Sequence, residues 1–110
     1  MITFFWPGTN ALFSYVVMQI SADSIIQRNK DIISSEIDGE TVMMDSSFSS
    51  YFGLKEVGTR IWQLLEERHS VHEICETLTN KYNVSQEQCL KDILPFLEEL
   101  HRQKMIEIHR

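Results

Sequence analysis

Four histidines are the side chains of this sequence best suited to bind a metal or transfer a proton. His69 and His72 lie close together, whereas His101 and His109 lie near the C-terminus. A zinc site needs three or four converging ligands, and neither cysteine stands at ligand spacing from a histidine. We therefore interpret the histidines as solvated surface residues and predict neither a metal site nor another cofactor.

Cys75 and Cys89 are the candidate nucleophiles, but a reactive thiolate needs an open, electropositive setting. Both lie on apolar helical stripes, so we predict small buried side chains in a reducing, cytoplasmic compartment. The carboxylate pairs at 66–67 and 98–99 are adjacent on predicted helices, and adjacent side chains diverge there. The four glycines are scattered and form no phosphate-binding loop. These absences favour a binding protein over an enzyme.

Length and charge narrow the class of partner. The 110 residues fit one domain, and 43% hydrophobic with 24% charged residues is typical of a folded chain. The net charge of -6 disfavours nucleic acid, because such binding depends on cations that neutralise phosphates.

Residues 1–20 differ from the rest: they contain three Phe, one Trp and one Tyr but no Lys or Arg. A secretory signal has a basic start, and the apolar run 11–20 is too short to span a bilayer. We treat 1–20 as an N-terminal extension, with Met18 as the hypothetical native start, and 21–110 as the domain. The alternative is a strand, about Leu12–Ile20, that docks on the sheet.

The segments Ile32–Ile37 and Thr41–Asp45 predict a β-hairpin. Between them, Asp38-Gly39 favours a type I′ turn, in which both residues have positive φ. This turn places Ile37 opposite Glu40, and side chains then alternate between the two faces of the ribbon. The face that we predict to be the core face consists of Ile33, Ile37, Val42 and Met44.

A third strand, about Ser50–Leu54, is predicted to pair with the second strand and to leave its other edge open. Three helices follow. The first carries an apolar stripe from Val57 to Leu65, and capping boxes open the other two: Ser70 with Glu73, and Ser85 with Gln88. The predicted fold is α+β: a winged helix-turn-helix-like arrangement of a three-stranded antiparallel sheet followed by three helices.

The last helix has more apolar surface than one-sided packing requires. Leu90 and Leu94 widen its stripe, which favours a second contact surface, although a small core surrounding the helix explains the same pattern. Pro95 lacks an amide hydrogen, so we expect a kink there. Residues 105–109 are expected to end as an extended tail. The predicted core stripe comprises Cys89, Ile93, Phe96, Leu97 and Leu100.

At residues 45–54 (Asp-Ser-Ser-Phe-Ser-Ser-Tyr-Phe-Gly-Leu), the sequence resembles the PqqD-like proteins, and residues 55–65, 71–74 and 92–100 fit the same pattern. These proteins are the recognition elements of pathways that modify ribosomally made peptides (RiPP recognition elements). The chain is most similar to stand-alone members from lasso-peptide clusters, over about Ile25–Ile108. Ser49 replaces a frequent glycine of the family and Lys55 a frequent asparagine, which affects the local turn and cap.

The resemblance implies that the leader segment of a precursor peptide binds as an added strand on the open edge of the third strand. Its side chains would enter a groove against the last helix. Tyr51 and Phe52 point to opposite faces, so only one lines that groove. The implied peptide-binding residues are Ser50, Tyr51, Phe52 and Gly53 on the strand, Leu90, Leu94 and Leu97 as the apolar wall, and Lys91, Asp92 and Glu98 as the charged rim.

The resemblance also implies partner enzymes: in lasso-peptide pathways a cysteine-protease-like leader peptidase and an ATP-dependent cyclase, and in the pyrroloquinoline quinone pathway a radical enzyme. The sequence leaves the pathway open. An alternative is a DNA-binding winged helix, but residues 85–92 (Ser-Gln-Glu-Gln-Cys-Leu-Lys-Asp) make a poorly cationic recognition helix. Another is a structural subunit of a larger enzyme. Neither nucleic acid nor a membrane is a predicted partner.

Overall fold

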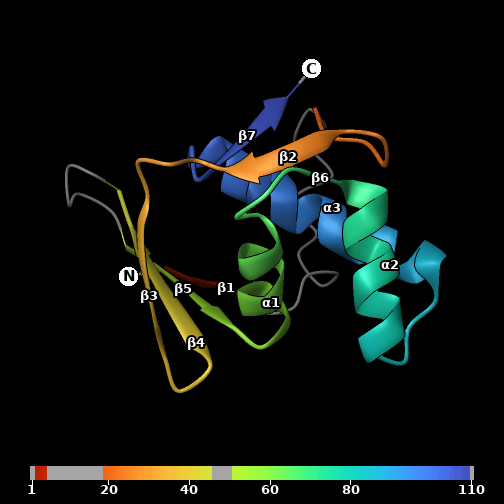
Figure 1. Ribbon diagram of the computed structural model, residues 1–110, viewed down its shortest axis with the longest axis horizontal. Helices are drawn as coiled ribbons and strands as arrows, with labels where there is room; N and C mark the ends of the chain where they lie inside the picture. The colour runs from red at the N-terminus through yellow and green to blue at the C-terminus, as the bar shows by residue number, and fades with distance from the viewer. Residues whose placement is uncertain (1, 5–18, 46–50, 110) are drawn as a thin grey trace.

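The computed structural model describes residues 2–4, 19–45 and 51–109. Within these ranges the chain forms two small sheets and three helices, which confirms the predicted α+β fold (Figure 1). The first sheet has the strand order β1-β5-β4-β3. The second has the order β6-β2-β7, in which β6 is His69–Ser70, β2 is Ile25–Arg28 and β7 is Ile106–His109. The elements of the first sheet are β1 (Ile2–Phe4), β3 (Ile33–Ile37), β4 (Glu40–Met44) and β5 (Tyr51–Lys55).

The predicted hairpin is confirmed in turn and in register. Asp38 and Gly39 have φ values of 53° and 79°, as a type I′ turn requires. Ile37 pairs with Glu40 and Ile33 with Met44 in the antiparallel ladder between β3 and β4. The local sequence is therefore sufficient to align these two strands.

The predicted core face of this hairpin is wrong. Thr41 and Met43 are 0% exposed, whereas Ile33 and Ile37 are 50% and 62% exposed, and Val42 and Met44 are half-buried. The buried hydroxyl of Thr41 donates to Thr59 Oγ1 at 3.1 Å, and the hydroxyl of Thr59 donates to the carbonyl of Leu54 at 3.0 Å. These bonds offset the cost of burying Thr41, so the face with fewer apolar residues packs inward.

β5 pairs antiparallel with β4, as predicted, but its other edge is not open. β1 lies along that edge in parallel orientation, with Ile2 opposite Phe52 and Phe4 opposite Leu54 (Figure 1). The prediction of an open edge is therefore wrong for the full chain. The hypothetical start at Met18, and most of the alternative strand 12–20, lie outside the described residues.

The three helices begin where the sequence predicts. Ser70 Oγ accepts the N–H of Glu73 at 3.0 Å, and Glu73 Oε1 accepts the N–H of Ser70 at 2.7 Å, which completes the first capping box and lowers the pKa of Glu73. Ser85 Oγ accepts the N–H of Gln88 at 3.1 Å, but the Gln88 side chain donates to Asp92, so Ser85 caps the helix and the prediction of a second complete capping box is wrong. The helices are α1 (Val57–Leu64), α2 (Val71–Lys81) and α3 (Gln86–Arg102).

α3 is 17 residues long, and its assigned helix includes Pro95. It supplies much of the core. The predicted apolar stripe is confirmed, since its five residues are at most 3% exposed: Cys89, Ile93, Phe96, Leu97 and Leu100. None of the helices in the described ranges is long and apolar enough to cross a membrane.

The second sheet joins segments that are distant in sequence: β2 (Ile25–Arg28), β6 (His69–Ser70) and β7 (Ile106–His109). The predicted C-terminal tail is thus a strand. Ile26, in the central strand, is 0% exposed, and the guanidinium of Arg28 lies 5.1 Å from the ring centre of Trp62 on α1. This sheet closes the core on the side opposite the hairpin (Figure 1).

Candidate functional site

The strand side of the predicted site is β5. Phe52 is 1% exposed and belongs to the core, whereas Tyr51 is 45% exposed on the outer face. Gly53, which lies between Phe52 and Leu54 in the strand, is also buried. Ser50 lies outside the described residues. Of the two aromatic residues, Tyr51 is therefore the one that presents its side chain to solvent.

The helix side of the predicted site is one face of α3. Leu90 and Leu94, one turn apart, are half-buried and pack against the core. Lys91 beside them is exposed, and the half-buried Asp92 accepts from the amide of Gln88 at 2.7 Å. Leu97 is 0% exposed and supports this face from beneath. The accessible part of this face is thus two half-buried leucines flanked by charge.

Glu98 was expected on the charged rim, and this expectation is wrong. Its side chain is 3% exposed, and Oε2 accepts the N–H groups of Gln19 at 2.5 Å and Ile20 at 2.7 Å. Two backbone donors replace the water that a buried carboxylate loses. Glu98 therefore anchors the chain that leads into β2, and Ile20 beside it fills the core.

The strand and the helix are brought together beneath the first turn of α1. A Cβ atom on Gly58 would lie 3.4 Å from Cβ of Leu54 on β5 and 3.5 Å from Cζ of Phe96 on α3. Side chains from all three elements share one core cluster. The candidate site is consequently built on packed secondary structure, which suits a surface that must hold a ligand in register.

Sequence reasoning missed two features of this site: the strand β1 on the β5 edge, and the anchor between Glu98 and residues 19–20. The second had a signal. Glu98 follows Leu94 by one helical turn and is adjacent to Leu97, so a carboxylate sits beside an apolar stripe. The first had none, because a three-residue strand has no readable pattern.

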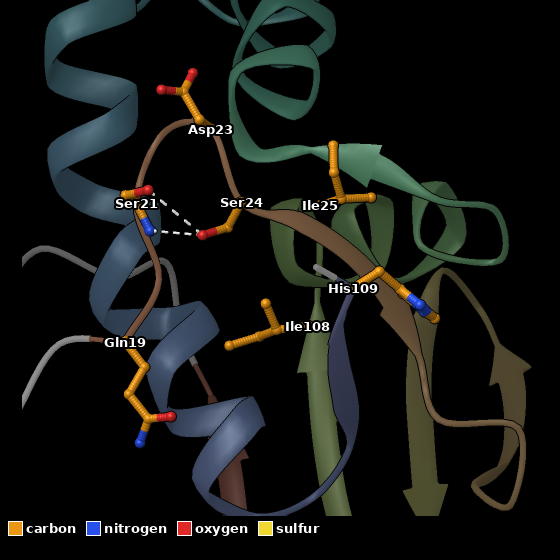
Figure 2. Close-up of a pocket in the computed structure, with 7 residues that line it drawn as sticks. All are labelled: Gln19, Ser21, Asp23, Ser24, Ile25, Ile108 and His109. Carbon is orange, nitrogen blue, oxygen red and sulfur yellow. Dashed lines mark hydrogen bonds between the residues drawn. The ribbon is translucent and has the colours of Figure 1, made fainter.

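A separate pocket of about 300 Å³ lies between the chain preceding β2, the start of β2 and the end of β7 (Figure 2). Within it the N–H of Ser21 donates to Ser24 Oγ at 2.9 Å, which tightens the turn before β2. None of the predicted peptide-binding residues lines it. The lining residues are Gln19, Ser21, Asp23, Ser24, Ile25, Ile108 and His109.

Three of the histidines, His69, His72 and His109, lie next to glutamates. His72 Nε2 is 3.1 Å from Glu76, and His69 Nδ1 is 3.9 Å from Glu73. In the described part of the chain, no three His, Cys, Asp or Glu residues are grouped so that they could hold a metal ion.

The two cysteines are buried and free, as predicted, at the contact between α2 and α3. Burial raises the pKa of the Cys75 thiol from 9.0 to about 12, and burial also raises the pKa of Cys89. Because only the thiolate is a nucleophile, neither side chain is set up for covalent chemistry.

Alkylation tests this assignment. At about pH 8, iodoacetamide is expected to leave both thiols of the native protein unmodified and to modify both in guanidinium chloride, as read by intact mass. The unfolded thiol of Cys75 loses its proton near 9.0, before the folded one at about 12. The contribution of the Cys75 thiol to the free energy of unfolding is therefore constant below pH 9 and falls as the pH rises further. Rapid modification of the native protein would contradict the burial.

Comparisons with known proteins identify a family and a similar fold. A family model described as "Coenzyme PQQ synthesis protein D (PqqD)" matches residues 40–106. A structure titled "TbiB1 in Complex with the TbiA(beta) Leader Peptide" is 32% identical and covers 76% of this chain and 98% of its own, with a TM-score of 0.70. A second, titled "Lasso peptide synthetase B1 complexed with the leader peptide", is 23% identical, covers 74% and 96%, has a TM-score of 0.66, and shows the fold alone. None of the curated proteins matches the chain.

Proposed function

This chain belongs to the PqqD family, and from that membership we propose that it binds the leader segment of a ribosomally made precursor peptide by strand addition. One observation carries the proposal: β1 pairs with the outer edge of β5 over three residues, so the main-chain groups at this edge are able to bond to an added strand. Strand addition gives affinity through main-chain hydrogen bonds, and alternate side chains give specificity. The TbiB1 structure, a complex with a leader peptide, supports the same role.

We assign the leader's main chain to Tyr51, Phe52 and Gly53 of β5 and to Ser50, the residue that precedes this strand in sequence. The exposed Tyr51 flanks the guest strand on the outer face, and Phe52 supports it from the core. On α3, Leu90 and Leu94 supply the apolar contact and Lys91 the flanking charge. Leu97 supports that contact from within, and Glu98 positions residues 19–20 beside it.

In this role the protein is a recognition partner and not a catalyst. It presents the peptide to maturation enzymes, which for a lasso-peptide pathway are a leader peptidase and an ATP-dependent cyclase. We place this work in the cytoplasm, where the precursor is made. The second candidate is a peptide chaperone for a radical enzyme, favoured by the family description, which refers to coenzyme PQQ synthesis.

A binding titration tests the proposal. A fluorescein-labelled leader of the precursor encoded next to this gene is expected to bind saturably, with the TbiA(beta) leader as a second probe. Replacing leader residues by proline should weaken binding at alternate positions, where the amides face β5. Fluorescence anisotropy measures both. Absence of binding up to about 100 µM, in the full chain and in a form that starts at Met18, would contradict the proposal.

A further inference from the structure

The peptide-binding edge that we propose is occupied in this chain by the chain itself. β5 has β4 on one side, antiparallel, and β1 on the other, parallel, so that Ile2, Thr3 and Phe4 lie opposite Phe52, Gly53 and Leu54 (Figure 1). A strand has one set of N–H and C=O groups at each edge. While β1 is paired, a guest strand cannot bond to the same groups.

The other described end of this segment is fixed to the helix side of the site. The N–H groups of Gln19 and Ile20 bond to Glu98, one helical turn beyond Leu94 on α3. The chain that begins at β1 is therefore fixed at residues 19–20 to a side chain one helical turn from Leu94, which is assigned to the leader. A strand tethered in this way has a high effective concentration at its own acceptor edge.

We propose that Ile2–Phe4 is a built-in competitor for the leader, and that a leader binds only by displacing β1 from β5. The inference rests on the proposed function and adds to it an intramolecular occupant of the same edge. Three residue pairs form few main-chain hydrogen bonds, so a longer guest strand with side-chain contacts can displace them. The apparent Kd equals the intrinsic Kd divided by the fraction of molecules with a free edge. If β1 occupies the edge for about nine-tenths of the time, removing it tightens leader binding about tenfold.

Proline substitutions in the full chain test the competition. The amides of Ile2 and Thr3 point to opposite sides of β1, so Ile2→Pro or Thr3→Pro removes a donor that faces β5. At least one of them is expected to lower the Kd for the labelled leader about tenfold. The matched control is Lys30→Pro, at an exposed turn position next to Asn29 where proline is favoured, and its Kd should equal that of wild type.

Hydrogen exchange without any leader provides an independent readout. The alternate amides of β5 that face β1 are expected to be protected in the wild type and to exchange faster in the proline variant that tightens binding, with the β4-facing amides unchanged. A synthetic peptide of residues 1–18, added in excess to that variant, should restore protection and compete with the leader. A scrambled peptide should do neither.

The outcomes separate the two proposals. If wild type and proline variants bind the leader equally and exchange alike, the competitor is ruled out and leader binding stands. If no variant binds the leader while β5 protection still depends on β1, leader binding is ruled out, and so is competition with it. Mass spectrometry of the native protein bears on the hypothetical start at Met18: if residues before Met18 are absent from the cell, the competitor is ruled out there.

Discussion

Leu94→Asp is expected to weaken leader binding at least about thirtyfold while the domain stays folded. Leu94 is half-buried, so in the free protein the new carboxylate retains access to water. In the complex the leader would cover it without supplying a partner, and burying an unpaired charge costs about 2 kcal/mol or more. Fluorescence anisotropy of the labelled leader gives the Kd, and circular dichroism shows whether the helices persist.

The matched control is Leu64→Asp, the same change at another half-buried leucine that packs on the core but lies on α1. It should lower stability to a similar extent and leave leader affinity unchanged. If Leu94→Asp binds as tightly as wild type, the assigned helix face does not touch the peptide. If both variants lose binding equally, the effect comes from the fold and not from a contact.

Glu98→Leu is expected to lower the free energy of unfolding by about 3 kcal/mol. The substitution removes a buried acceptor from two backbone N–H groups, at Gln19 and Ile20, and each charge-assisted hydrogen bond contributes about 1.5 to 3 kcal/mol. Glu98→Gln keeps an acceptor oxygen and should lose less. Urea unfolding followed by circular dichroism measures both differences.

Glu99→Leu is the control at the adjacent position. Glu99 is 13% exposed and accepts from the exposed Arg102 and from Gln103, three and four residues along the same helix, but within the described residues it binds no backbone group of a distant segment. A local helical pair of this kind contributes about 1 kcal/mol. Equal losses for Glu98→Leu and Glu99→Leu would show that the contact with residues 19–20 contributes nothing beyond a local side-chain pair within the helix.

Local features of the fold could be predicted from the sequence because neighbouring residues determine them. Asp38-Gly39 specifies a turn with positive φ, and that turn alone sets the register of β3 against β4. Ser70 and Glu73 satisfy each other's backbone donors within one helical turn. The apolar stripe of α3 follows from its 3.6-residue period, and it identified the buried face correctly.

The candidate site could be predicted only in part. The sequence placed Leu90, Leu94 and Lys91 on one helix face and Tyr51 and Phe52 on one strand, and the structure locates them there. The position of Glu98 beside an apolar stripe was a signal of burial, but that signal does not identify the partners that make burial of a carboxylate possible. Those partners are backbone groups 78 and 79 residues away.

What the amino-acid order determined by itself, then, was the set of helices, the N-caps at Ser70 and Ser85, the hairpin register and the resemblance of residues 45–100 to a peptide-binding family. Only the tertiary structure decided which hairpin face is buried, since alternation is the same for both faces and the bonded pair Thr41 and Thr59 favours the more polar one. It also decided that β1 lies on β5 and that β2, β6 and β7 form one sheet. These pairings join distant segments through main-chain hydrogen bonds that every residue but proline can donate, so they depend on which edges the folded core leaves exposed.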